Sequence, residues 1–184
     1  LLLRKHGIDA NSVVYMAVGF GGARLAALQT GTVDAVPLGA GDFAQLKQPK
    51  GHMLGDTEKE IRFAYVGLAV SNRLLARQPD LIERFLRSVI KGREYARRYR
   101  EQTIPIIEKY TQRKREFNEF DYDSTRPVLT AEGWVPDNVL REDVAMRAEL
   151  TGVPVPADVN KFFDYSITKK IYRELKTAGW EPMP

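Results

Sequence analysis

The sequence predicts an α/β fold, and three local patterns support this prediction. Residues 13–18 and 33–38 are apolar segments of the length and composition of strands. Good helix formers fill the stretch between them, at residues 23–30. Glycines at positions 19, 21 and 22, and again at 31, allow sharp turns on either side of this helix. Two strands joined by one helix in this way form a βαβ unit with parallel strands.

The segments on either side of this unit are less regular. Residues 1–6 are expected to form the end of a helix that stops at Gly7, and residues 9–12 a turn. Residues 39–51 are expected to form a loop with one helical turn that Asp42 would cap. Further strands are predicted at residues 52–55 and 62–71, the second being nearly continuous in apolar residues.

Helices are predicted for most of the chain after residue 72. They are expected at 72–78, at 80–99 with Pro79 in the first turn, at 104–115 capped by Thr103, at 116 to about 127, at 137–150 before Gly152, and at 165–179 after a cap at Asp164. The apolar faces of these helices must be buried, and three or four short strands offer little sheet to cover them. The helices are therefore expected to pack on one another or to need a sheet that this chain lacks.

Composition indicates an ordinary soluble globular protein. The 184 residues include 43% hydrophobic and 28% charged residues, with a net charge of +4 and no cysteine. Disulfides and thiol chemistry are therefore excluded. No apolar run approaches the roughly 18 residues of a membrane span, and the opening residues do not form a signal peptide. Because the first residues already look like the middle of a helix, we expect a fragment or a processed product.

Positive charge is concentrated in one part of the chain. Residues 91–115 contain nine Lys or Arg and three Glu. A nucleic-acid surface is one interpretation of such a stretch. The solvated face of long helices is the preferred one, because acidic residues are interspersed and no nucleic-acid-binding motif accompanies the charge. No nucleic-acid partner is therefore predicted.

The glycine turn at residues 19–23 is the first candidate site, since ligands of βαβ units bind at the carboxyl ends of the strands. Its sequence departs from a dinucleotide fingerprint because Arg24 replaces the last glycine. Backbone N–H groups at the start of a helix can still bind an anion or a polar group. A tight turn with no ligand is the alternative, and Arg24 is expected to face away from the turn.

Enzyme chemistry is not expected. His6 and His52 lie far apart in the sequence, and neither belongs to a metal-binding motif. No nucleophile elbow is present, and the chain has no cysteine nucleophile. The prediction is a protein without catalytic residues, without a metal site and without a cofactor.

Several segments together resemble a known family. They are LLRKHGID at 2–9, AALQTGTVDAV at 26–36, HMLGDT at 52–57, the long stretch 64–97 and FDYSITKKIYRELKTAGW at 163–180. These resemble the solute-binding proteins of ABC transporters of the nitrate/sulfonate/taurine type, to which thiamine-pyrimidine-precursor binders are related. The resemblance implies a type II periplasmic-binding fold. Residues 1–63 would then be a segment of the second lobe and residues 64–184 a helix-rich part of the first lobe, whose N-terminal portion is missing.

The resemblance also implies function. It suggests a binding component, or a truncated relative, of an uptake system for a small solute that is anionic or aromatic, with an ABC permease as partner in the periplasm. The implied ligand-binding residues are Gly19, Phe20, Gly21, Gly22, Ala23, Gly39, Gly41, Asp42 and Tyr65. A chain without the first part of the fold is expected to form a homodimer or a domain-swapped dimer. The alternatives are a sensor or interaction module that no longer transports and, third, an enzyme of pyrimidine-precursor chemistry, whose histidine and cysteine motifs this sequence lacks.

Overall fold

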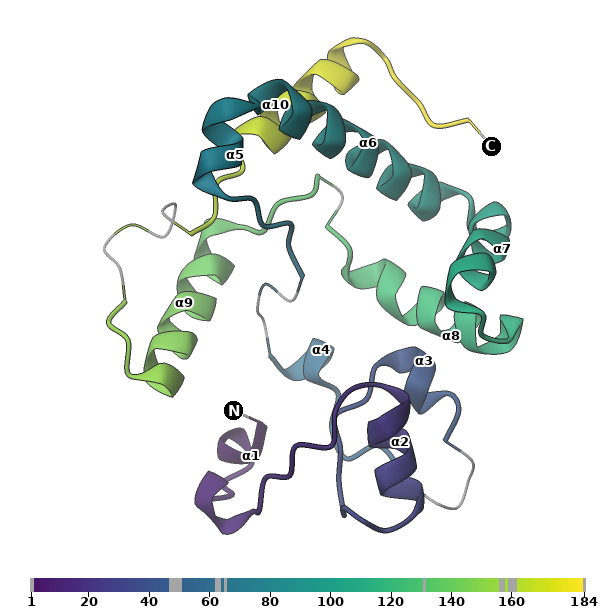
Figure 1. Cartoon of the computed structure of the whole chain (residues 1–184), viewed down its shortest axis with the longest axis vertical. Helices are drawn as coiled ribbons and strands as arrows, with labels where there is room; N and C mark the ends of the chain where they lie inside the picture. Colours follow the sequence, from purple (N-terminus) through teal and green to yellow (C-terminus); the bar gives the residue numbers. More distant parts are fainter. Residues whose placement is uncertain are drawn as a thin grey trace. The chain divides into compact units, whose positions relative to one another are not determined.

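Helices are the only regular elements in the part of the chain that the structure describes. The computed structural model describes residues 2–46, 51–61, 64, 66–130, 132–155, 158 and 162–183, and it contains no β-strand within them (Figure 1). The predicted α/β fold class is therefore wrong for these residues. Of the segments predicted as strands, 13–18, 33–38 and 52–55 lie in irregular structure, as do the described residues 64 and 66–71 of the segment 62–71.

The predicted strands fail for a physical reason. A strand is stabilised by hydrogen bonds to a neighbouring strand, so a strand-like sequence without a partner forms no ladder. The side chains of these segments are accordingly left in solvent, with Val14 94% exposed and Val66 83% exposed. The βαβ unit predicted from the sequence retains only its central helix.

The chain divides into two compact units. Residues 1–61 and 103–128 form unit 1, and residues 62–102 and 129–184 form unit 2. The two domains predicted from the sequence, residues 1–63 and 64–184, remain a prediction.

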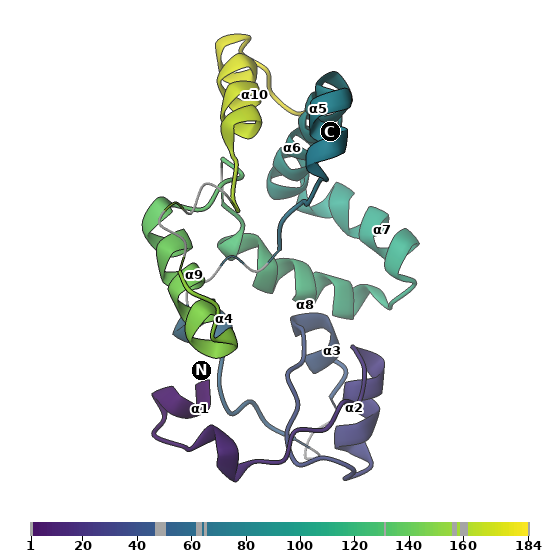
Figure 2. The same cartoon turned by 60° about the vertical axis from the view of Figure 1, so that its left-hand side comes forward.

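Unit 1 contains short helices around the two glycine-rich turns. Its elements are α1 (Leu2–Lys5), the 3₁₀ turn η1 (Ala10–Ser12), α2 (Gly22–Gln29), α3 (Ala40–Phe43), α4 (Thr57–Glu60), most of α7 (Arg100–Thr111), α8 (Arg115–Thr125) and η2 (Arg126–Val128). Helix α3 packs against α8 and also contacts α2 (Figure 2). These contacts place the two turns, which precede α2 and α3, in the same part of the unit.

Helix boundaries in unit 1 agree in part with the sequence predictions. The helix predicted at 23–30 is confirmed as α2, and Gly31 after it has the expected left-handed conformation with φ of 72°. The predicted role of Asp42 as a helix cap is wrong, because α3 begins after Gly39 and Asp42 is its third residue. Thr103 is likewise no cap, since α7 begins at Arg100 and Thr103 lies buried inside it.

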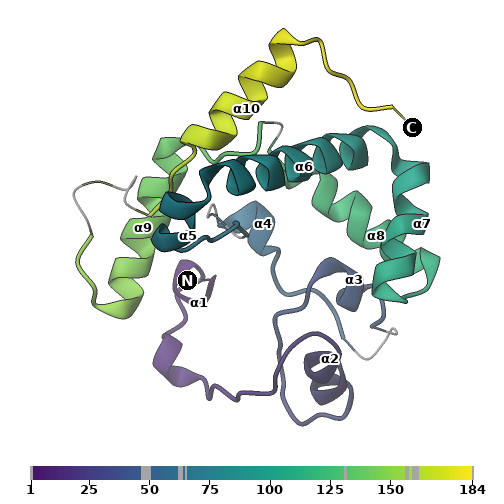
Figure 3. The ribbon, with the colours of Figure 1, turned by 45° about the horizontal axis from the view of Figure 1, so that its top comes forward.

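Unit 2 contains two long amphipathic helices packed side by side. Its elements are α5 (Asn72–Arg77), α6 (Pro79–Arg98), α9 (Asp137–Thr151) and α10 (Ser166–Thr177). Helix α6 has Pro79 at its start, and α10 packs against it at an angle (Figure 3). Ile90, Ile171 and Leu175 form their buried core. The helices predicted at 80–99, 137–150 and 165–179 are confirmed to within a few residues.

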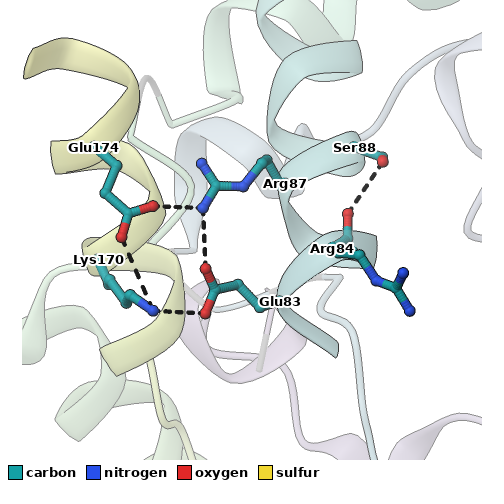
Figure 4. A network of polar contacts seen from close by, with 6 residues as sticks. All are labelled: Glu83, Arg84, Arg87, Ser88, Lys170 and Glu174. Carbon is teal, nitrogen blue, oxygen red and sulfur yellow. Dashed lines mark hydrogen bonds and ion pairs between the residues drawn. The ribbon is translucent and has the colours of Figure 1, made fainter. Parts of the chain in front are cut away.

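Charged side chains join α6 to α10 at the edge of this core. Lys170 Nζ lies 2.7 Å from Glu83 Oε2, and Arg87 Nη2 lies 3.0 Å from Glu83 Oε1 (Figure 4). Arg87 also pairs with Glu174 of α10. Lys170 Nζ also lies 3.9 Å from Glu174 Oε1, so the four residues form a closed network of alternating charge. This network adds ionic contacts to the apolar contact between α6 and α10.

None of the helices in the described part of the chain combines the length and apolar character that a membrane crossing needs.

Candidate functional site

The two turns singled out from the sequence lie against each other in unit 1. Gly21 precedes α2 with φ of 46° and ψ of −115°, a conformation that residues with a side chain rarely adopt. A Cβ added at Gly21 would lie 3.3 Å from Asp42 Oδ2 in α3. We call residues 19–23 and 39–42 together the turn site. Glycine at position 21 thus allows both the turn and the close approach of the Asp42 carboxylate.

Asp42 is a buried, paired carboxylate in this site. The residue is only 9% exposed. Its Oδ1 accepts a hydrogen bond of 3.0 Å from Arg113 Nη2, which comes from the segment between α7 and α8. Burial of a carboxylate is costly unless a charged partner is present, and Arg113 supplies that charge.

Gly41 is packed tightly between the same arginine and a second carboxylate. Its N–H donates to Asp121 Oδ1 over 3.2 Å. A Cβ at this position would lie 2.7 Å from Arg113 Nη1 and 3.2 Å from Asp121 Cγ. The absence of a side chain at Gly41 is therefore what lets α3 approach Arg113 and Asp121 closely.

Arg24 folds back over the glycine turn. Its Nε donates to the Gly19 carbonyl over 2.7 Å, and its Nη1 donates to the Pro37 carbonyl over 3.4 Å. The guanidinium carbon lies 5.2 Å from the centroid of the Phe20 ring, within the range of a cation–π contact. The prediction that Arg24 faces away from the turn is therefore wrong.

The start of α2 remains open to solvent. Phe20 is 85% exposed, and a Cβ added at Gly22 would have nothing within 4 Å. Ala23 N donates to the Phe20 carbonyl over 3.0 Å, which closes the turn. The site therefore combines an exposed helix N-terminus, an exposed aromatic ring and a buried carboxylate.

A family comparison matches the part of the chain that contains this site. The model of the family described as NMT1/THI5 like matches residues 1–103 of the 184. The chain belongs to the NMT1/THI5-like family. This finding supports the predicted relation to nitrate/sulfonate/taurine-binding proteins and thiamine-precursor proteins at the level of the family. Comparison with curated proteins and with solved structures found no match.

Most residues predicted to bind a ligand in this NMT1/THI5-like chain can be located. Gly19, Phe20, Gly22, Ala23 and Gly39 lie at exposed positions around the two turns, and Gly21 is half-buried. Gly41 and Asp42 are buried where α3 packs against α8. Tyr65 lies outside the described residues. The structure thus brings the two predicted turns together and adds contacts that the sequence did not indicate.

Arg113 and Asp121 are the residues that the sequence analysis missed. They lie 71 and 80 positions along the chain from their partners Asp42 and Gly41. In the sequence, Arg113 is one of nine basic residues in the stretch 91–115. No local pattern could have identified either residue, because both act through long-range contacts.

Other features of the described surface do not coincide with the turn site. Two open depressions are lined by Lys114, Arg115, Glu116 and Glu119 in one case, and by Lys170, Arg173, Glu174, Thr177 and Ala178 in the other. Among the described residues there is no group of three or more His, Cys, Asp or Glu side chains that could hold a metal ion.

Proposed function

We propose that this NMT1/THI5-like chain binds a small organic solute at the turn site, as the substrate-binding component, or a truncated relative, of an ABC uptake system. The observation that carries the proposal is the contact of Gly21 with Asp42, which joins the two turns predicted to line a ligand site. Both turns fall within the residues that the family model matches.

The exposed groups of the turn site support a binding role. Phe20 presents an aromatic face on which the apolar part of a solute can stack. Arg24 lies beside this ring and is fixed by two backbone carbonyls, so little side-chain entropy is lost when a solute contacts it. The open N-terminus of α2 offers backbone N–H groups to a polar atom of the solute.

The wider role that we propose is the one typical of the family. A permease of the ABC type would receive the solute, and the protein would act outside the cytoplasm as a binding protein rather than as an enzyme. Family membership supports this assignment at a coarse level, and the proposal extends it to this chain.

Self-association is part of the proposal. Three large side chains of the strand-like segments are strongly exposed: Val14 (94%), Tyr15 (74%) and Val66 (83%). Such exposure of apolar side chains is typical of surfaces that bind another protein. We propose that a homodimer or a domain-swapped dimer covers them. Light scattering on the purified chain tests this point, and a monodisperse monomer would contradict it.

The same exposed side chains favour one alternative function. A sensor or interaction module derived from the family would use an apolar surface to bind a protein and would bind no transported solute. A dimer or protein complex that binds no nitrate, sulfonate, aromatic acid or pyrimidine would favour this alternative.

A ligand screen with a matched pair of variants tests the proposed function. Thermal shift with nitrate, sulfonates, aromatic acids and pyrimidines should find one class that stabilises the chain saturably. Phe20→Ala should weaken that binding by about tenfold, the loss expected for one aromatic contact. Tyr110→Ala is the control, because Tyr110 is also exposed and also lies near a cation, Lys109, but belongs to α7. Equal affinities for the two variants would contradict the proposal.

A further inference from the structure

We propose that Asn118 of α8 is a positioning residue of the turn site: it fixes the backbone of Arg113, which in turn holds the second turn, residues 39–42, in place. This inference rests on the proposed function, because it names the residue on which the order of the binding surface depends. Asn118 acts on the site through another residue, and it would not touch the solute itself.

Asn118 is a buried amide whose two ends both bind the turn between α7 and α8. The residue is 0% exposed. Its Nδ2 donates to the Arg113 carbonyl over 3.0 Å, and Thr111 Oγ1 donates to its Oδ1 over 2.9 Å. The N–H of Arg113 donates to the same hydroxyl oxygen of Thr111 over 3.3 Å. The amide therefore bridges both ends of the segment 111–113, and its loss would leave buried polar groups unpaired.

The bridged segment contains a residue in a strained conformation. Gln112 has φ of 54°, the only positive φ of a residue other than glycine in the described part of the chain. Such a conformation persists only where the surrounding contacts determine it. Here those contacts are the bonds that Asn118 and Thr111 make on either side of it. Without the amide, the segment should relax and the backbone of Arg113 should move.

The side chain of Arg113 carries this position to the turn site. Its Nη2 donates to Asp42 Oδ1 over 3.0 Å, and a Cβ added at Gly41 would lie 2.7 Å from its Nη1. Asp121 Cγ would lie 3.2 Å from the same Cβ, so the guanidinium occupies a narrow space. A shift of the Arg113 backbone would therefore break the ion pair with Asp42 and loosen the contact of α3 with α8.

Hydrogen exchange of the Gly41 amide tests the inference without any solute. This N–H donates to Asp121 Oδ1, so its exchange reports the contact of α3 with α8. Asn118→Leu keeps the approximate size of the side chain and removes both bonds. The Gly41 amide should then exchange at least about tenfold faster relative to the Leu25 amide of α2. Ile104→Val, at a buried position of α7, is the control for a general loss of stability and should leave this ratio unchanged.

A second substitution separates positioning from general stability. Gln112→Gly removes the strain at position 112, because glycine adopts positive φ readily. The double variant Gln112→Gly/Asn118→Leu should therefore recover most of the protection of the Gly41 amide. An exchange ratio in Asn118→Leu equal to that of the unmodified chain or of Ile104→Val, or no recovery in the double variant, would overturn the inference.

Thr111→Val keeps the inference testable if Asn118→Leu does not fold. Thr111 is exposed, and this substitution removes its bond to Asn118. Thr151→Val is the matched control, because Thr151 at the end of α9 also bonds the carbonyl four residues before it and the N–H two residues after it. Exchange of the Gly41 amide should become faster in Thr111→Val and not in Thr151→Val, and equal exchange in the two would overturn the inference. Since these measurements contain no solute, failure of the solute screen would contradict the proposed function alone.

Discussion

Arg113 Nη2 lies 3.0 Å from Asp42 Oδ1, and this ion pair joins positions 71 residues apart in the sequence. Arg113 comes from the segment between α7 and α8, whereas Asp42 is the third residue of α3. The pair therefore fixes the second turn of the turn site to the helical part of unit 1.

Arg113→Gln should destabilise unit 1 by about 2 kcal/mol, because it leaves the Asp42 carboxylate buried without its cation. The partial exposure of Arg113 keeps the loss below that of a fully buried pair. Urea unfolding measures the difference. Arg84→Gln is the control, since Arg84 is an exposed arginine of α6, and an equal effect of the two substitutions would contradict the role of the pair.

Gly21→Ala should destabilise the chain by about 1–3 kcal/mol, because alanine strains a backbone with φ of 46° and brings its Cβ against Asp42. Gly22→Ala should be neutral or stabilising by up to about 1 kcal/mol, since Gly22 begins a helix and has open space around it. Thermal unfolding of the two neighbouring variants gives the comparison. A Gly21→Ala variant more stable than Gly22→Ala would contradict the strain expected for alanine at position 21.

Local signals in the sequence were sufficient for α2, α6, α9 and α10. Pro79 at the start of α6, the glycines after α2 and α9, and the apolar spacing along α6 and α10 each act within one or two turns of helix, so they could be predicted without the rest of the fold. The strands could not, because a strand-like segment such as 13–18 becomes a strand only when a partner pairs with it.

In the candidate site, too, local features could be predicted from the sequence and long-range contacts could not. The glycine turn followed from the sequence of residues 18–31, whereas residues 39–42 were assigned to the site only through the family resemblance. The ion pair with Arg113 and the contact of Gly41 with Asp121 depend on how α3 packs against α8, which no local pattern encodes. Arg24 was misplaced because its contacts are with backbone carbonyls, whose positions depend on the folded turn.

The charged network between α6 and α10 predicts a pH dependence. Hydrogen bonds from Lys170 and then Arg87 lower the pKa of Glu83 below its ordinary value of 4.5. A carboxylate whose pKa is lower in the folded state contributes stability above its unfolded pKa and loses it as the pH falls through the folded value. The stabilisation from Glu83 should therefore be fully present at pH 7, should begin to fall near pH 4.5 and should be lost as the pH falls through the lower pKa of the folded state.

Melting temperatures of the unmodified chain and Glu83→Gln between pH 7 and pH 3 measure this contribution. The difference between the two should be largest near neutral pH and shrink on acidification. Glu142→Gln, at an exposed position of α9, should show no such trend. A constant difference across the range would exclude the network as its cause.

Ile171→Ala should destabilise unit 2 by about 3 kcal/mol, because Ile171 is 0% exposed at the contact of α10 with α6. Chemical unfolding followed by tryptophan fluorescence detects the loss, since Trp180 packs against the same core. Thr177→Ala, at an exposed position near the end of α10, should have little effect. A similar response to both substitutions would mean that α10 is not held by this core.

Amide chemical shifts during a solute titration show whether the turn site binds a small organic solute. The stabilising solute from the ligand screen should produce saturable shifts at the amides of Gly21, Gly22 and Gly41, with one common dissociation constant. Saturable binding whose shifts fall elsewhere in the chain, or no binding by any solute of the screen, would contradict binding at the turn site.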